Sequence, residues 1–400
     1  MVIINLILKN FRNHSYRNFD FKEGLNLITG ENAVGKTNIV EAIYYLSLAR
    51  SFRTSEDSEL ILRGAESTLV EATITEGEIK RKITVKLSEN KKEIFVNNKK
   101  ITKLSQLSSA VNVIEFTPED VMLFKGSPRD RRKFLDIALS KKNPLYLDYI
   151  SRYEKALKER NEILKSDNFD EKLLEASTEV LAKLTGPIMS YRQSYVKDIN
   201  DVLLFITRAL TGVCEDKFEI KYEPFIDYNS DYMNNALNAF NKSLERDIRT
   251  KLTNVGIHRE DFSMSLNGRD IATFGSQGEN RIAALALKLS PYFLIEDEDK
   301  RPIVVLDDVM SELDNSRREN LIKFLNKFKQ VFITGTNLSS KNAHLVELKK
   351  ILKTREVFYG RREESWVSCR KYWARCRCSK NGHPWIRTQR RRDRIRKSRC

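Results

Sequence analysis

Eight residues near the N-terminus have the types and spacing of a loop that binds phosphate. They fit the pattern G-x-x-x-x-G-K-[ST] and read Gly30-Glu31-Asn32-Ala33-Val34-Gly35-Lys36-Thr37. In such a loop the glycines let successive backbone N–H groups face the phosphates, the lysine reaches the β- and γ-phosphates, and the hydroxyl binds Mg²⁺. The alternative is a chance glycine-rich turn, but an apolar strand pattern precedes the loop and a helical pattern follows it. The motif therefore predicts nucleotide binding, with Lys36 on the phosphates and Thr37 on the metal ion.

Two carboxylates directly follow a purely apolar run, Ile303–Leu306, later in the chain. Such a run is typical of a central parallel strand, so Asp307 and Asp308 are expected at its carboxyl end. Asp307 would hold Mg²⁺, through water, and Asp308 would polarise the water that attacks a phosphate. The alternative interpretation is an acidic strand end that binds no metal. The phosphate loop in the same chain favours the metal site over this alternative.

A third candidate element, Ser276-Gln277-Gly278-Glu279, precedes a predicted helix. Its simplest interpretation is a capping box, with Ser276 as the N-cap and Glu279 reaching back. The start of a helix also attracts anions, so Ser276 and the Gly278 N–H are candidates for binding a γ-phosphate. The segment Ser311-Glu312-Leu313-Asp314 has the same two interpretations ahead of another predicted helix.

The elements that must position these residues follow from the hydrophobic patterns. Three kinds of segment are expected: strands in the first third, helices from the Ser127-Pro128 start to about residue 213, and strands with helices after it. The predicted strands are 2–8, 16–21, 25–30, an antiparallel meander of 68–75, 79–87 and 93–97, then 111–116, 217–222, 262–266 and 270–274 around an Asn267-Gly268 turn, 303–306 and a last strand 331–334. The predicted helices outside the middle third are 38–46, 279–289 and 315–329. We therefore expect an α/β fold with one lobe split between the two ends of the chain and one inserted helical lobe.

Composition narrows the class of protein. The chain has 400 residues, 40% of them hydrophobic and 32% charged, which predicts a globular protein of two or three domains and excludes a fibrous or disordered one. No apolar run approaches the ~18 residues that span a bilayer, and the N-terminus lacks a signal peptide's basic region, so a cytoplasmic location without membrane partners is expected. The formal net charge is +16, but residues 361–400 contribute +12 of it, so the body alone gives little indication of nucleic acid. Cys214 is the one cysteine before residue 369, which fits a reducing compartment.

Together these elements resemble the ABC-type ATPases of the SMC family, and among them the RecF-like bacterial recombination and replication-repair proteins. The resemblance rests on stretches that run in order over about residues 1–340: LILKNFRNHSYRNFDF, GLNLITGENAVGKTNIVEAIYYLSLARSFRT, FTPEDVMLFKGSPRDRRKFLD, YEKALKERNEILK, FGSQGENRIAALALKL and IVVLDDVMSELD. It implies an ABC-type P-loop ATPase head, lobe I, formed by residues 1–126 and 215–350. The helical insertion, lobe II, would be residues 127–214, a size that fits neither a transporter ATPase nor a long coiled coil.

The resemblance also assigns roles to single residues. Two subunits would sandwich ATP, with Ser276, Gln277 and Gly278 of one subunit facing the phosphate loop of the other. Asp307 would be the metal-binding Walker B residue, and Asp308 would stand where many ABC ATPases have a catalytic glutamate, its shorter side chain fitting slow hydrolysis. Asp314 matches the D-loop. Arg12 resembles an arginine that lies near the nucleotide in the family. The alternative interpretation is that Arg12 is a surface arginine that contacts no phosphate.

The function implied by the resemblance is ATP-dependent DNA binding in replication, recombinational repair and the SOS response. An ATP-driven homodimer would bind single-stranded, double-stranded or gapped DNA, at gaps or single-strand/double-strand junctions, and support recombinase loading with RecR/RecO-type mediator proteins. The basic cluster Arg129, Arg131, Arg132 and Lys133 would contact DNA phosphates or form a solvated helix face. One rival function is a nucleotide-gated scaffold whose ATP turnover is incidental. The other is a transporter ATPase, which would need a membrane partner and a shorter insertion.

Residues 351–400 depart from the family pattern and from the rest of the chain. They are rich in Arg, Trp and Cys, whereas the body is rich in Lys, Asn and Ile. Three interpretations remain: a basic DNA-binding arm with interleaved aromatic residues, a zinc site, and a frameshifted or foreign sequence. A zinc site would use Cys369, Cys376, Cys378 and His383, but their spacing matches no standard site, and the abrupt change of composition favours the third interpretation.

Overall fold

The structure is a computed structural model of the 400-residue chain. It describes residues 1–102, 106–107, 110–166, 168, 170–228, 231–311, 313–336, 338–340 and 342–349. Glu312 and the whole of residues 351–400, with the three interpretations of that segment, lie outside the described residues.

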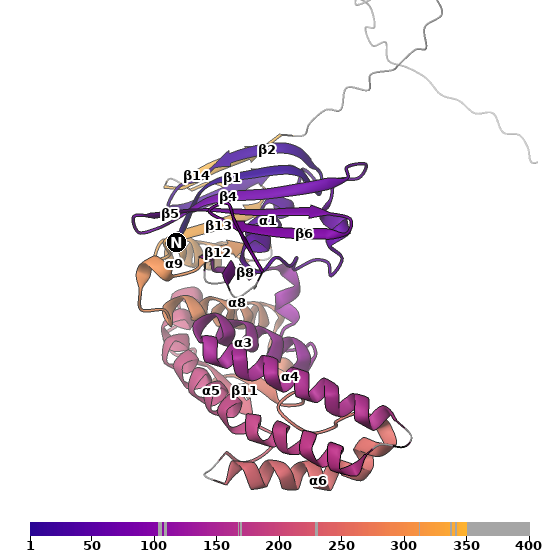
Figure 1. Cartoon of the computed structure of the whole chain (residues 1–400). Helices are drawn as coiled ribbons and strands as arrows, with labels where there is room; N and C mark the ends of the chain where they lie inside the picture. Colours follow the sequence, from indigo (N-terminus) through magenta and orange to yellow (C-terminus); the bar gives the residue numbers. More distant parts are fainter. Residues whose placement is uncertain are drawn as a thin grey trace, which may run out of the picture. The chain divides into compact units, whose positions relative to one another are not determined.

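An antiparallel sheet of six strands is formed by the first hundred residues (Figure 1). Its strand order is β2-β1-β4-β5-β6-β7, and the predicted meander is confirmed because β4, β5 and β6 pair antiparallel in sequence. Buried and half-buried residues alternate along most of β4, which fits the side-chain period of two in a strand whose two faces differ in cover. The strands are β1 Val2–Phe11, β2 His14–Asp20, β4 Ser67–Glu76, β5 Ile79–Ser88, β6 Lys91–Val96 and β7 Lys99–Ile101.

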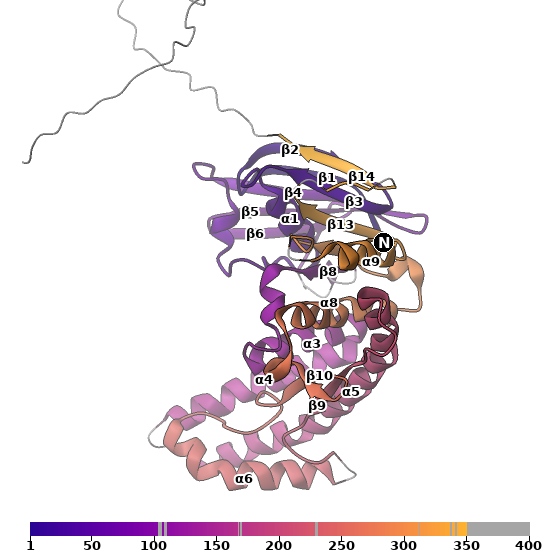
Figure 2. The same cartoon turned by 180° about the vertical axis from the view of Figure 1, so that it is seen from behind.

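A second sheet of five parallel strands combines both ends of the described chain. Its order is β14-β3-β13-β12-β8, from β3 Gly24–Gly30, β8 Val113–Phe116, β12 Ile303–Leu306, β13 Gln330–Gly335 and β14 His344–Leu348. The strand predicted at 303–306 is confirmed, and both of its faces are buried. The expectation that residues 331–334 form the last strand is wrong, because β14 follows and pairs with β3 (Figure 2). This edge strand leaves Leu345 54% exposed and buries only Leu348 deeply, so its sequence lacks the continuous apolar run of a central strand.

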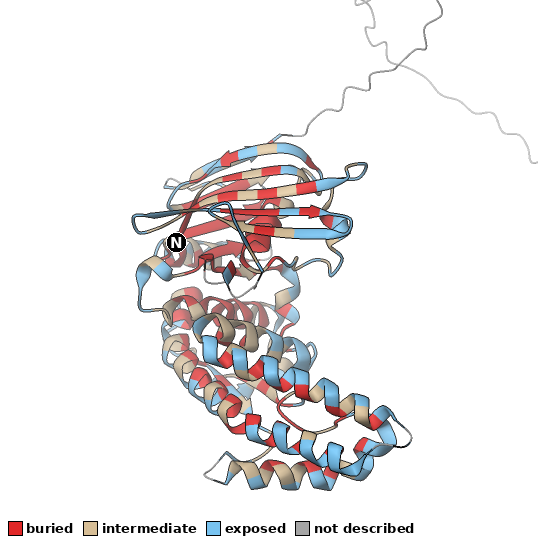
Figure 3. Ribbon diagram, viewed as in Figure 1, coloured by how far each residue is buried: buried red, intermediate tan, exposed pale blue. Residues whose placement is uncertain are grey.

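Helix α1, Lys36–Leu48, lies between the two sheets. Every residue from Ile39 to Ser47 is buried, and the helix contacts strands of both sheets, including β13 and β4 (Figure 3). A helix covered on all sides shows no apolar stripe, which is why its sequence is apolar nearly throughout. The phosphate loop at its start is therefore attached to one of the most completely buried helices in the described chain.

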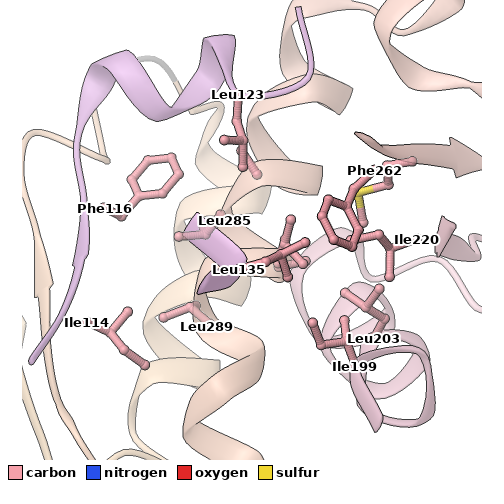
Figure 4. Packing of buried hydrophobic residues seen from close by; sticks show 14 of the residues in the cluster. Ile114, Phe116, Leu123, Leu135, Ile199, Leu203, Ile220, Phe262, Leu285 and Leu289 are labelled. Carbon is pink, nitrogen blue, oxygen red and sulfur yellow. The ribbon is translucent and has the colours of Figure 1, made fainter. Parts of the chain in front are cut away.

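A second hydrophobic core covers the other face of the parallel sheet. Here Leu285 and Leu289 of α8 pack against Ile114 and Phe116 of β8, and Leu135 of α3 joins the same cluster (Figure 4). The predicted helical region from 127 to about 213 is confirmed as three helices, the first starting at the N-cap Ser127 followed by Pro128. The helices and single turns are α3 Pro128–Lys142, α4 Pro144–Lys165, α5 Glu171–Thr211, α6 Tyr232–Thr250, α7 Ile271–Phe274, α8 Gln277–Phe293, α9 Asn315–Leu325, and the 3₁₀ turns η1 Asp57–Leu60, η2 Pro118–Met122 and η3 Glu298–Lys300.

A small three-stranded sheet, β11-β10-β9, packs on the helices and not on the two larger sheets. Its strands are β9 Phe218–Glu223, β10 Asp261–Leu266 and β11 Arg269–Asp270. The prediction of a strand at 270–274 is wrong after Asp270, because Ile271–Phe274 form the short helix α7. The Asp270 carboxylate accepts a hydrogen bond from Thr273 N at 2.8 Å and so caps this helix. Because β9 and α6 contact α5, and β10 contacts α3, the contacts show no division at residue 214. The boundaries of the two lobes stay a prediction.

Candidate nucleotide-binding site

The phosphate loop connects the carboxyl end of β3 to the start of α1, the position at which parallel α/β sheets bind ligands. Glu31, Asn32 and Ala33 are exposed at the tip of the loop. Ala33 and Gly35 have φ angles of 65° and 103°, so the backbone curls through the left-handed region on both sides of Val34. This is the backbone shape that turns successive N–H groups toward one point.

The loop is held from behind by the turn between β1 and β2. His14 is 2% exposed, and its Nε2 lies 3.2 Å from Gly35 O, so Nε2 carries the proton and donates. Burial lowers the pKa of His14, which favours this neutral form. Asn13 Oδ1 accepts a hydrogen bond from Asn38 Nδ2 at 2.8 Å, which ties the same turn to the first turn of α1. A β-carbon on Gly35 would lie 2.6 Å from Asn13 Oδ1 and 2.7 Å from the His14 ring.

Gly35→Ala is therefore expected to weaken nucleotide binding about tenfold. The substitution forces both a left-handed φ on alanine and a shift of a buried imidazole, and together these cost about 1–3 kcal/mol. Equilibrium binding of a fluorescent ATP analogue measures the effect. Gly268→Ala is a matched control, because Gly268 also has a positive φ, 78°, but its β-carbon would meet open space. Equal affinity of the Gly35 variant and the wild type would contradict this account.

Lys36 points its ammonium group back over the loop. Its Nζ donates to Gly30 O and to Glu31 O, both at 2.8 Å. These two carbonyls hold the cation at the mouth of the loop, where a phosphate oxygen would be a stronger, charged acceptor. The geometry is that of a lysine ready to exchange two neutral hydrogen bonds for a charge-assisted one.

Thr37 and Asp307, separated by 270 positions in sequence, meet at the site. Thr37 Oγ1 donates to Asp307 Oδ1 at 3.0 Å, and Thr334 Oγ1 donates to the same oxygen at 2.5 Å. The two residues predicted to share a metal ion are thus brought together, because β12 and β3 lie on either side of β13 in the parallel sheet. Thr334, at the end of β13, was not predicted, and a lone threonine gives no sequence pattern that would have identified it.

Asp308 occupies the second position beyond β12, directly after Asp307, and is exposed. Its backbone N donates to Thr334 Oγ1 at 2.9 Å, and its φ of 48° turns the chain sharply away from the strand. The structure therefore places the Asp308 carboxylate in solvent beside the buried Asp307. A solvent-facing carboxylate one residue from the metal candidate is where a group that orients water is needed.

Burial raises the pKa of Asp307 above its usual value; hydrogen bonds from Thr334 and Thr37 oppose the shift, and the charge of Asp308 adds to it. The folded state thus holds a proton on Asp307 more tightly than the unfolded state does, so the ionised carboxylate costs stability above the raised pKa. Asp307→Asn is expected to raise the melting temperature of the nucleotide-free protein at pH 7. The gain should shrink as the pH falls through the raised pKa toward the usual one, because wild-type Asp307 then becomes neutral.

Differential scanning calorimetry at several pH values between 4 and 8 measures this stability difference. Asp308→Asn is the matched control, since the exposed Asp308 should change the melting temperature less. If the gain in melting temperature of Asp307→Asn grew toward acid pH, the result would contradict a raised pKa of Asp307.

Arg12 is engaged by a carboxylate of α1. Its Nε and Nη2 donate to the two oxygens of the fully buried Glu41 at 2.9 and 2.6 Å, and Nη1 donates to Glu59 O at 3.0 Å. This bidentate pair joins the turn between β1 and β2 to the second turn of α1. Arg12 is therefore near the loop but committed to Glu41, and its contact with a nucleotide stays a prediction.

Arg53 is a candidate that the sequence analysis missed. Its Nη1 donates to Asn38 Oδ1 at 2.9 Å and to Glu41 Oε2 at 3.3 Å, and its side chain is 43% exposed. Its charge also lowers the pKa of Asp307, so it lies close enough to act on the acidic pair. The only indication in the sequence is an arginine shortly after the end of α1, a pattern too common to single it out.

Ser276 is the N-cap of α8, and the predicted capping box is confirmed. Ser276 Oγ accepts from Glu279 N at 3.2 Å, and Ser276 N donates to Glu279 Oε2 at 2.7 Å. The hydrogen bond from Ser276 N, and after it the Ser276 side chain, lower the pKa of the Glu279 carboxyl group. The buried Asn280 donates to three carbonyls, those of Ile271, Gly275 and Ser276, and so fixes the turn that precedes the helix.

Asp314 caps the next candidate helix, α9, by accepting a hydrogen bond from Arg317 N at 2.9 Å. Among the hydrogen bonds and ion pairs of the described residues, none joins Ser276, Gln277, Gly278 or Asp314 to the phosphate loop of the same chain. These residues are exposed or half-buried on the surface. The structure thus leaves their predicted role toward a second subunit as a proposal.

The basic cluster at the start of α3 divides into two pairs. Arg131 donates to both oxygens of Asp261 at 2.7 Å and, through Nη1, to the carbonyls of Leu123, Phe124 and Gly126, while Arg132 donates to Glu260 O. Both arginines therefore hold α3 to neighbouring segments. Arg129 and Lys133 are exposed and are the members of the cluster that remain candidates for contacting a phosphate backbone.

Comparison with known proteins places this site in context. The profile of the RecF/RecN/SMC N terminal domain family matches residues 2–357. The DNA replication and repair protein RecF of Clostridium novyi is 37% identical over 355 residues, 88% of this chain and 98% of the relative. The RecF of Geobacillus kaustophilus is 35% identical over 361 residues, 87% of this chain and 96% of the relative.

Solved structures give the same picture. The recombination mediator protein RecF with ATP, from the RecFOR pathway, superposes with a TM-score of 0.78 at 34% identity and covers 86% of this chain and 97% of that one. An Smc head domain from Pyrococcus furiosus superposes with a TM-score of 0.51 at 18% identity, which shows a shared fold. Among the described residues, no helix combines the length and apolar character needed to cross a bilayer.

Proposed function

Because this chain belongs to the RecF family of DNA replication and repair proteins, within the RecF/RecN/SMC ATPases, we propose that it binds ATP at residues 30–37 and uses it to dimerise on DNA. Its fold is that of an ABC-type ATPase head with an inserted helical lobe. The observation that carries the proposal is the hydrogen bond between Thr37 and Asp307, which assembles the phosphate loop and the acidic strand end into one site.

The residues present fit Mg²⁺. The site offers one buried carboxylate and one hydroxyl, the hard oxygen ligands that Mg²⁺ takes from proteins when phosphates and waters complete its shell. Burial raises the pKa of the Asp307 carboxyl group, and among the described residues no ion pair neutralises it. Thr37 and Asp307 would hold the ion, which would neutralise charge on the β- and γ-phosphates.

In the proposed reaction the protein acts by positioning and by charge. Lys36 releases the carbonyls of Gly30 and Glu31 and binds the β- and γ-phosphates, and the loop N–H groups bind their oxygens. Asp308 accepts a hydrogen bond from the attacking water and orients it toward the γ-phosphorus. Arg53, held by Asn38 and Glu41, supplies positive charge that acts on Asp307. A short aspartate in the water-orienting position fits slow hydrolysis, so ATP serves chiefly to hold a dimer together.

The proposed contacts of one subunit with ATP held by the other are the exposed Ser276, Gln277 and Asp314 and the half-buried Gly278. Closing such a dimer brings two copies of the exposed Arg129 and Lys133 into one assembly, which can create a DNA-binding surface that a monomer lacks. The body of the chain has only a small net positive charge, which gives a monomer little attraction for DNA. DNA binding by a dimer therefore fits this charge better than DNA binding by a monomer. Single-stranded/double-stranded junctions and gaps are the proposed DNA structures, and RecO- and RecR-type mediators the proposed partners. We also propose that the protein supports recombinase loading, takes part in the SOS response and is located in the cytoplasm.

Fluorescence anisotropy with a gapped DNA duplex tests the proposal. With ATP, the full chain is expected to bind the duplex at least tenfold more tightly than without it, with a steep protein-concentration dependence that indicates a dimer. The chain truncated after residue 360 should show the same ATP dependence, which separates the site from the net charge of +12 in residues 361–400. Equal affinity with and without ATP would contradict the proposal.

Lys36→Arg separates an ATPase from a nucleotide-gated scaffold. Arginine keeps the positive charge but changes its shape, so a variant that binds ATP without turning it over is expected. If this variant retains full DNA-repair function in cells, ATP turnover is incidental and the scaffold is correct. Loss of repair with retained ATP binding supports the ATPase.

A further inference from the structure

Arg317, in the first turn of α9, lies against the backbone of Gly278. A β-carbon on Gly278 would be 2.5 Å from Arg317 Nη1, a distance at which one of the two must move. The guanidinium thus occupies the space in which any other residue at 278 would place its side chain. This contact joins the segment Ser276–Gly278 to the segment around Asp314, although the two are more than thirty positions apart in sequence.

The guanidinium of Arg317 is only partly neutralised where it lies. Its Nε is 3.4 Å from Asp314 Oδ2 in an ion pair whose two side chains are 36% and 58% exposed. Among the described residues, neither Nη1 nor Nη2 makes a hydrogen bond. Its charge reaches Glu279 only as a minor contribution to the lowered pKa of that residue. Four guanidinium N–H donors therefore have no acceptor in the part of the chain that the structure describes, and they are available to a ligand.

The neighbouring Arg318 shows the contrasting case. Its Nε donates to Met310 O at 2.8 Å and its Nη2 donates to Ser311 O at 3.4 Å, so it fastens the loop between β12 and α9. Arg318 is a structural arginine with carbonyl partners, whereas Arg317 reaches toward Gly278 and keeps its donors unused. The two adjacent arginines therefore cannot have the same role.

We infer that Arg317 binds the γ-phosphate of ATP held by a second copy of the chain. The inference rests on the proposed ATP-dependent dimer, in which Gly278 and Asp314 face the partner's nucleotide. A guanidinium that touches both segments then lies at the same face, and its two NH₂ groups match two oxygens of a phosphate. Arg317 acts in trans, stabilises the charge that develops on the transferred phosphoryl group and makes turnover depend on dimerisation.

The first test compares Arg317→Ala with the wild-type full chain. ATP turnover in the presence of DNA is expected to fall 10- to 100-fold, the range of a charge-assisted hydrogen bond. The affinity of the monomer for ATP should stay within about twofold, because the phosphate loop of the same chain is intact. Lys323→Ala is the matched control: Lys323 is on α9 and 74% exposed, and its removal should leave turnover unchanged. Unchanged turnover in Arg317→Ala would overturn the inference.

Mixing variants decides whether Arg317 acts in trans. Arg317→Ala keeps its phosphate loop, and Lys36→Arg, which is expected to bind ATP without turning it over, keeps its Arg317, so a mixed dimer contains one complete composite site. Equal amounts of the two inactive variants should recover up to about a quarter of wild-type turnover, because half of the dimers are mixed and each has one of two sites. If Arg317 acted on its own chain's nucleotide, no mixed site would be complete and no turnover would return.

A parallel mixture of Ser276→Arg with Lys36→Arg separates this inference from the dimer on which it rests. Recovery in both mixtures supports Arg317 in trans. Recovery with Ser276→Arg but not with Arg317→Ala overturns the role of Arg317 and leaves the dimer standing. Recovery in neither mixture contradicts the trans arrangement itself, and the role of Arg317 falls with it.

Discussion

Lys36→Met is expected to reduce the affinity of this protein for ATP about 100-fold. Methionine keeps most of the length of the side chain and removes the charge, so the β- and γ-phosphates lose a charge-assisted hydrogen bond of about 1.5–3 kcal/mol. The fold should be unaffected, because the carbonyls of Gly30 and Glu31 that Lys36 now occupies lie at a solvent-accessible loop. Isothermal titration calorimetry with ATP and Mg²⁺ measures the loss.

Lys99→Met is the control for the general loss of a positive charge. Lys99 is exposed on β7, and its substitution should leave ATP affinity unchanged. The ATP-dependent increase in DNA affinity should disappear in Lys36→Met and persist in Lys99→Met. A Lys36→Met protein that still binds ATP within threefold of the wild type would refute the assignment of residues 30–37.

Arg160→Met is expected to destabilise the helical part of the protein by about 3 kcal/mol or more. Arg160 and Asp247 are both fully buried and form an ion pair at 2.9 Å between α4 and α6. Arg160 also donates to Thr253 Oγ1 at 2.7 Å and to Thr178 Oγ1 at 2.9 Å, so one guanidinium joins four segments. Removing it leaves an uncompensated carboxylate in the interior, which costs about 3–5 kcal/mol. Ser243 and Asn254 still donate hydrogen bonds to Asp247 Oδ1 in this variant, so we expect the loss of stability to lie at the lower end of that range.

Hydrogen exchange of the α6 amides and the midpoint of urea unfolding measure this loss. The double variant Arg160→Met, Asp247→Asn should recover part of it, because no buried charge then remains without a partner. ATP affinity should be unchanged in both variants, since the phosphate loop packs in the other hydrophobic core. A single variant as stable as the wild type would show that water reaches Asp247.

Local patterns determined much of this protein from the sequence alone. The phosphate loop, the acidic end of β12 and the capping box at Ser276 could all be identified, because each depends on residues that are neighbours in the chain. The same holds for α1, the β4–β6 meander and the helices from Ser127 onward, whose periodicity reflects one continuous element. The family followed from the order of these motifs along the chain, and the comparisons confirmed it.

Only the tertiary structure decided which distant residues meet. The hydrogen bond of Thr37 to Asp307, the place of Arg53 beside Asn38 and the contact of Arg317 with Gly278 depend on how β3, β12 and the helices pack. The edge strand β14 and the turn α7 were missed for a related reason. The first is set by pairing with β3 and the second by one capping carboxylate, and neither leaves a periodic pattern. Spacing along a chain fixes local conformation, whereas contacts between segments are set by burial and sheet register, which one sequence does not display.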